Sequence, residues 1–332
     1  MSYRLFFVSF LSLILLTPGA ASAQSLGGSL GDTGPFSVSI SPQYPIPGGQ
    51  VTLSFLSSTL DLTNATMTIL VGGKQTYQGS IQPIAIPLGK NGAAVSVTVK
   101  ITSEGISYSQ SVVIQPEDVS LIAEPLSSAP VLYPGKPLIP LGGNTRVVAI
   151  ANFKDAAGRT LSPATLSYSW TVDDTQIANS SGIGKAAVIV ASPLQYRERT
   201  VSVSVRSQSG SLVGGASLSL KPVEPSVLIY ENDPLLGIRF DHALSGAYSL
   251  RGTEASLYAA PFSLPLAGAP LIQWFLNGSM AQTGSLITLR PTGSGQGSAS
   301  LSLIASTGES TRATTNLSLS FGEKPSTNFF GL

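Results

Sequence analysis

Short runs in which apolar and hydroxyl side chains alternate dominate the chain. Residues 36–40 (FSVSI), 51–55 (VTLSF) and 201–205 (VSVSV) are clear examples. A period of two puts successive side chains on opposite faces of an extended strand, so each run predicts a strand with one buried face. Clusters of Pro and Gly, such as residues 47–49 (PGG), separate the runs and predict turns. The pattern therefore predicts an all-β protein.

One arrangement of strand and turn occurs three times. Its three copies, each an apolar residue followed by a turn dipeptide, are Ile69 with Gly72-Gly73, Trp170 with Asp173-Asp174, and Trp274 with Asn277-Gly278. The copies are spaced by about 100 residues, which is the size of an independent domain and exceeds the roughly 20–50 residues of a solenoid repeat. We therefore predict three tandem domains over residues 36–116, 117–223 and 224–321.

The predicted domain boundaries are short and contain proline. Pro116 marks the first boundary, and Pro222 and Pro225 flank the second. Linkers of this composition are stiff rather than flexible. The sequence thus predicts a semi-rigid rod.

The N-terminal residues have the composition of an export signal. Arg4 precedes the apolar residues 5–16, and residues 21–23 (ASA) fit the small-residue cleavage rule. We expect a signal peptide over residues 1–23, then a flexible Gly/Ser leader over residues 24–35. The alternative is an uncleaved membrane anchor, although the apolar run is shorter than the ~20 residues that a bilayer requires. The mature chain is then expected without a membrane span, in the periplasm, at the cell surface or outside the cell.

Trp170 and Trp274 lie in the middle of predicted strands, with apolar residues two positions to either side. Both indoles are therefore expected to face inward. This placement resembles the third strand of immunoglobulin-like and PKD-like bacterial domains, in which an aromatic side chain fills the space between two sheets; Ile69 takes that position in the first copy. The resemblance covers residues 36–321 and implies β-sandwiches. The alternative for each Trp is an exposed platform that stacks on a sugar.

Composition narrows the classes of function. Charged residues are 11% of the chain and the net charge is +1, which gives no reason to expect a nucleic-acid partner. With no Cys and one His, thiol catalysis and zinc sites of thiolates or several imidazoles are excluded. Asp241 and His242 are adjacent, but no G-x-S-x-G element accompanies them. Residues 182–185 (GIGK) lack the rest of a phosphate-binding loop. We expect no enzyme and no cofactor.

Acidic residues near the two predicted boundaries are candidate calcium ligands. Glu117, Asp118 and Glu124 lie near the first boundary, and Glu231 and Asp233 lie near the second. Carboxylate oxygens suit Ca²⁺, which would stiffen the rod. No spacing among them matches a defined calcium loop, and the alternative is solvated charge at the domain ends.

Three further segments are irregular in sequence. Residues 126–144 contain four prolines and are either a binding loop or a packed edge loop. Residues 235–251 form a similar insertion around the only histidine, which is expected in a loop or on the surface. Residues 322–332 are expected to be a loose tail whose last four residues (FFGL) form either a docking tag or a frayed end.

Three hypotheses of function follow from these features. The first is a non-enzymatic exported structural or adhesive protein that presents a semi-rigid array of domains at the cell envelope. The second is a module that binds a carbohydrate or surface polymer through residues 126–144 or an exposed aromatic. The third is an accessory subunit of a pilus or secretion apparatus. The expected partner is a protein or glycan at the cell surface.

Overall fold

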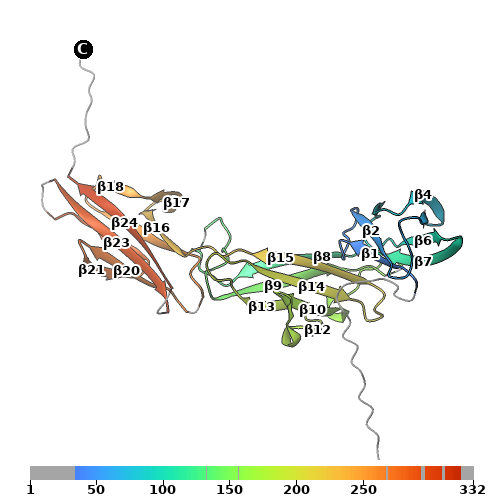
Figure 1. The fold of residues 1–332 in the computed structure, drawn as a ribbon. Helices are drawn as coiled ribbons and strands as arrows, with labels where there is room; N and C mark the ends of the chain where they lie inside the picture. The colour runs from blue at the N-terminus through green and yellow to red at the C-terminus, as the bar shows by residue number, and fades with distance from the viewer. Residues whose placement is uncertain are drawn as a thin grey trace, which may run out of the picture.

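The computed structural model describes residues 34–322, except residues 132, 156, 267, 293–295 and 309–310. The predicted signal peptide, all of the leader but its last two residues, and the tail from residue 323 lie outside the described residues. The described chain forms three pairs of β-sheets that lie end to end (Figure 1). We call them the first, second and third sandwich in chain order.

The first sandwich packs a three-stranded sheet on a four-stranded one. The sheets, in strand order, are β1 (Ser37–Ser41), β2 (Gln50–Leu56) and β5 (Ile84–Pro87), and then β4 (Lys74–Ser80), β3 (Thr66–Val71), β6 (Val95–Ser103) and β7 (Ile106–Ile114). Alternate residues of the facing strands are buried, so the apolar half of each run closes one core that includes Val38, Leu53 and Ile69.

The second sandwich repeats this arrangement. Its sheets are β13 (Ala187–Ala191), β9 (Asn144–Asn152) and β8 (Asp118–Pro125), and then β11 (Thr175–Gln176), β10 (Ser167–Val172), β14 (Arg199–Arg206) and β15 (Val213–Leu220). A short strand, β12 (Gly182–Ile183), also pairs with β10. Two single-turn 3₁₀ helices, η1 (Pro163–Thr165) and η2 (Ala178–Ser180), occupy connections around β10.

The third sandwich has larger sheets because residues 235–251 add strands to both. The sheets are β17 (Gly237–Leu244), β16 (Ser226–Asp233), β19 (Ala255–Phe262) and β22 (Leu286–Leu289), and then β18 (Gly246–Leu250), β24 (Thr311–Phe321), β23 (Gly297–Thr307), β20 (Leu271–Leu276) and β21 (Ser279–Thr283). Treating residues 235–251 as an irregular insertion was therefore wrong. β17 forms a hairpin with β16 and β18 pairs in parallel with β24, so each adds an edge strand to its sheet.

The repeated apolar position occupies the same place in each sandwich. The cross-strand pairs there are Ile69 with Val99, Trp170 with Val203, and Trp274 with Leu303. Both indoles are fully buried, in separate cores. Each indole Nε1–H donates a 2.8 Å hydrogen bond to a backbone carbonyl, that of Lys185 or Gly284. The alternative of an exposed sugar-stacking platform is therefore wrong for both.

The turn dipeptides close two-residue hairpins after that position. Both residues of each turn have positive φ, for example 46° and 64° at Asp173 and Asp174. Such turns match the right-handed twist of the strands and favour Gly, Asn or Asp. The side chains of Asp173 and Asn277 also accept a 2.9 Å hydrogen bond from the next strand, at the N–H of Thr200 and Ser300. Local chemistry thus specifies the same hairpin in these two copies.

The chain is an all-β protein, as its alternation predicts, and its paired sheets are the immunoglobulin-like sandwiches that the resemblance implies. In the part of the chain that the structure describes, we find no helix with the length and apolar character needed to cross a bilayer.

Candidate functional site at the two joints

The first joint lies where the β1–β2 loop of the first sandwich meets β15 of the second. Tyr44 approaches the backbone of Gly215 so closely that a Cβ atom there would lie 2.5 Å from Tyr44 Cδ2 and 2.7 Å from its Cε2. Real Cβ atoms do not approach other atoms this closely. The ring therefore occupies space that any larger residue at position 215 would fill.

A second loop of the first sandwich, between β5 and β6, closes the joint with hydrogen bonds. Asn91 Nδ2 donates to the carbonyl of Asn152 at 2.6 Å, and Asn91 Oδ1 accepts from the N–H of Asp118 at 3.2 Å. The N–H of Gly92 donates to the carbonyl of Pro116 at 2.9 Å. The side chain of Asn91 thus bonds to backbone groups of the second sandwich, at Asp118 and Asn152.

Glu117 is a buried carboxyl in this joint, with only 3% of its surface exposed. Its Oε1 accepts a 3.1 Å hydrogen bond from Gln115 Nε2, and its Oε2 accepts a longer one, 3.4 Å, from the N–H of Lys154. Burial raises the pKa of the Glu117 carboxyl above its ordinary value of 4.5, against the smaller lowering effect of these two bonds. Burial in the joint therefore disfavours the ionised carboxylate, relative to an exposed glutamate.

This burial gives the first joint a pH dependence. Because the pKa of the Glu117 carboxyl is raised in the folded state, the protonated carboxyl stabilises the fold. This contribution is complete below the ordinary pKa of 4.5 and is lost as the pH rises through the raised pKa. We expect the melting temperature of the wild type, measured relative to Glu117→Gln, to fall as the pH rises above the ordinary value of 4.5. Comparison with the Gln variant cancels the opposite contributions of exposed carboxylates such as Asp61 and Asp155, whose pKa values are lowered. A difference that does not change with pH would contradict this assignment.

The second joint is a clasp formed by the proline-rich segment, residues 126–144. Its Ser128 exchanges backbone hydrogen bonds with the β19–β20 loop, donating to the carbonyl of Leu264 at 2.7 Å and accepting from the N–H of Ser263 at 3.0 Å. Ser128 Oγ also accepts from the N–H of Leu264 at 3.0 Å. The N–H of Leu266 donates to the carbonyl of Leu126, again at 3.0 Å. The second and third sandwiches thus share a short stretch of strand-like pairing.

An aromatic cluster extends the clasp. Tyr133 meets Phe262 with ring centroids 4.9 Å apart and Phe240 at 5.8 Å, both edge to face. Phe240 in turn meets Tyr230 at 5.2 Å and Tyr258 at 6.1 Å. Edge-to-face pairs are worth about 0.5–1.5 kcal/mol each beyond the area they bury. The proline-rich segment therefore contacts the third sandwich through residues 126–128 and Tyr133, which favours the packed loop over the free binding loop.

The three calcium candidates near the first joint have separate partners. Glu117 is the buried carboxyl described above. Asp118 begins β8, and its N–H is bound to Asn91. Glu124 forms an ion pair with Arg146.

The two calcium candidates near the second joint also have separate hydrogen-bond partners. Glu231 accepts a 3.3 Å hydrogen bond from the hydroxyl of Tyr248, whose pKa burial raises to about 12. Asp233 accepts from the N–H groups of Leu236 and Leu235, which lower the pKa of its carboxyl. Within the described ranges, no three His, Cys, Asp or Glu side chains gather as a metal site. The five candidates do not converge on one point.

The remaining chemical candidates are surface groups. Arg239 donates two 3.0 Å hydrogen bonds to Asp241 and lowers the pKa of that carboxyl. His242 follows on β17 and is exposed, on a strand rather than in a loop. Lys185 Nζ donates to the carbonyl of Asn179 at 2.8 Å. None of these arrangements positions a nucleophile beside a base.

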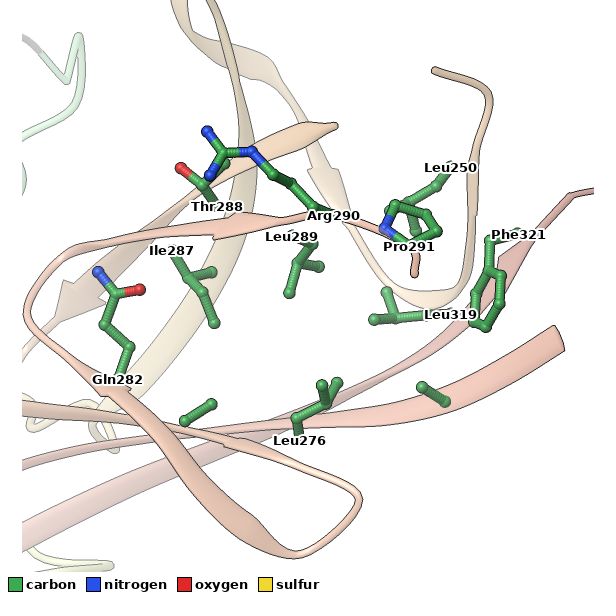
Figure 2. A pocket seen from close by; sticks show the side chains of 12 residues that line it. Leu250, Leu276, Gln282, Ile287, Thr288, Leu289, Arg290, Pro291, Leu319 and Phe321 are labelled. Carbon is green, nitrogen blue, oxygen red and sulfur yellow. The ribbon is translucent and has the colours of Figure 1, made fainter. Parts of the chain in front are cut away.

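A cavity of about 340 Å³ opens between the sheets of the third sandwich. Figure 2 shows Ile287 and Leu289 pointing into it, toward Leu276 and Leu319, whereas Arg290 points away. Arg290 is paired with Glu254 at 2.9 Å. The cavity is an apolar gap at the end of the core and carries no reactive constellation.

Comparisons with known proteins find only distant likenesses, all among solved structures. No family model matches the chain, and no curated protein matches it. Solved structures that resemble it include the central fibronectin-III array of RIM-binding protein, with 8% identity, coverage of 88% of this chain and 97% of that one, and a TM-score of 0.27. The three N-terminal domains of the bacteriophage RB49 Highly Immunogenic Outer Capsid protein are 12% identical to it. That match covers 88% of this chain and 100% of the other, with a TM-score of 0.23. A Bacteroides ovatus glucan-utilization protein, SGBP-B, in complex with a heptasaccharide is 12% identical. That match covers 89% of this chain and 77% of the other, with a TM-score of 0.21. At these TM-scores, none of the three carries an argument about this chain.

Proposed function

We propose that this chain is an exported, non-enzymatic structural or adhesive protein that presents a semi-rigid array at the cell envelope. The three sandwiches are its domains, over residues 36–116, 117–223 and 224–321. The observation that supports this most directly is that both joints are closed by hydrogen bonds and aromatic contacts beyond the linker itself. Neighbouring domains that are merely tethered need no such contacts.

The chemistry of the joints fits a role that depends on spacing. Each joint uses loops of one domain to satisfy backbone groups of the next, and the residues concerned are far apart in sequence: Ser128 and Leu264 at the second joint, Asn91 and Asn152 at the first. An array with fixed joints holds whatever its outer surfaces bind at a set distance and angle. That property serves adhesion or scaffolding rather than turnover.

The native host cell provides the test. We expect the protein isolated from it to begin at Gln24, and we expect protease added to intact cells or to cells with a permeabilised outer layer to digest it. A chain that retains residues 1–23 and is protected until the cytoplasm is opened would contradict export, and with it the proposed function.

A further inference from the structure

We propose that a cleft at the first joint binds a neutral, hydroxyl-rich glycan. The cleft lies between the β1–β2 loop, which carries Tyr44, and the outer face of β10, β14 and β15. This inference rests on the proposed array, because the first domain forms one wall and the second domain forms the floor.

The floor of the cleft follows from strand alternation. Tyr168, Trp170 and Val172 face the core, so Ser169 and Thr171 face outward. Their neighbours on the adjoining strands, Ser202 of β14 and Ser217 of β15, face the same way and are bonded Oγ to Oγ at 3.1 Å. The cleft volume of about 580 Å³ falls within the ~300–1,000 Å³ typical of ligand sites.

The lining selects a class of ligand. Six of the lining residues carry hydroxyl groups: Tyr44, Ser169, Thr171, Ser202, Ser204 and Ser217. Gln176 adds an amide, and Asp174 adds an exposed carboxylate. Hydroxyls and amides both donate and accept hydrogen bonds, as sugar hydroxyls do. Because none of the described lining residues is Lys or Arg, the cleft has no counter-charge for a phosphate, sulfate or uronate.

A buried hydroxyl also lacks a partner in this cleft. Ser204 is 6% exposed, and its Oγ has no hydrogen-bond partner among the described residues. Ser204 is paired across the strands with Gly215, the residue against which Tyr44 stands. Leaving a buried hydroxyl without a hydrogen bond is unfavourable, and a ligand hydroxyl is a partner of matching chemistry.

Tyr44 supplies the apolar half of the site. Its ring is held at the edge of the cleft by the close approach to Gly215. An aromatic ring packs against the C–H face of a pyranose while the floor bonds its hydroxyls. Comparable hydroxyl pairs on the first domain, such as Thr98 and Ser111 at 2.9 Å, are exposed and lie in none of the cavities described here.

Affinity electrophoresis of the mature chain tests the proposal. The gels contain a β-glucan, a galactomannan or glycogen as neutral probes, and alginate as the anionic probe. We expect at least one neutral polysaccharide to retard the wild type and alginate not to. Gln176→Ala combined with Ser217→Ala should weaken the retardation about tenfold, the effect of ~1.4 kcal/mol of lost hydrogen bonding. Thr98→Ala is the matched hydroxyl deletion outside the cleft and should leave it unchanged.

Two results would overturn the site. One is the absence of retardation by every neutral polysaccharide in the panel, and the other is retardation that the double variant leaves intact. Spin labels across the first joint, measured on separate samples so that the gels use unlabelled protein, separate this failure from failure of the array. A narrow distance distribution without retardation rejects the glycan site alone, whereas a broad distribution rejects the fixed array.

Discussion

Trp274→Ala is expected to lower the free energy of unfolding of the third domain by about 3–5 kcal/mol. The indole is fully buried in that core, and its removal leaves both a cavity and the carbonyl of Gly284 without its hydrogen-bond donor. Chemical denaturation followed by circular dichroism measures the effect, because the substitution removes the tryptophan of the third domain. Trp170 remains in the variant and reports on the second domain, whose transition is expected not to move.

The matched control for this change is Met280→Ala. Met280 lies on β21, next to the strand of Trp274, but is 62% exposed. Truncation of an exposed side chain of this kind changes stability by no more than about 0.5 kcal/mol. If the two variants were equally stable, the indole would not fill a core, and the placement of the repeat would be wrong.

Tyr133→Ala is expected to open the second joint without unfolding either neighbour. The change removes two edge-to-face contacts, with Phe240 and Phe262, worth together about 1–3 kcal/mol. Amide hydrogen exchange at Leu264 and Leu266 measures the opening, because their N–H groups donate across the joint. Both amides should exchange about five- to 150-fold faster, since ~1.4 kcal/mol corresponds to a factor of ten.

Tyr196→Ala is the control for the joint. This tyrosine belongs to the second domain, like Tyr133, but is 93% exposed. Its removal is expected to leave exchange at Leu264 and Leu266 unchanged. If Tyr133→Ala also left those amides unchanged, the clasp would not depend on the aromatic cluster.

Much of the fold is readable from the sequence because its causes are local. Alternation at residues 51–55 and 201–205 predicts strands that the structure has as parts of β2 and β14. Turn chemistry at Gly72-Gly73 and Asn277-Gly278 predicts hairpins, and both pairs adopt the required positive φ. Apolar and polar residues alternate less clearly in residues 235–251, so the sequence does not predict β17 and β18. Those strands depend on pairing with β16 and β24.

The joints could not be read in the same way. Tyr44 and Gly215, or Ser128 and Leu264, meet only after the domains have formed, so neither residue carries a local signal of the other. Glu117 belongs to an acidic pair that the sequence alone presents as solvated charge or a metal ligand, whereas the structure buries it against Lys154 and Gln115. The proline density of residues 126–144 marks an unusual loop but does not say that it clasps the next domain.

The account depends above all on the two joints being fixed, and pulsed electron resonance measures this directly. Since the natural chain has no Cys, paired labels can be introduced at exposed sites without competing thiols, at Lys100 and Thr175 across the first joint and at Thr175 and Ser279 across the second. We predict a single narrow distance distribution for each pair. Broad distributions for both pairs, of the width expected for freely tethered domains, would contradict the account.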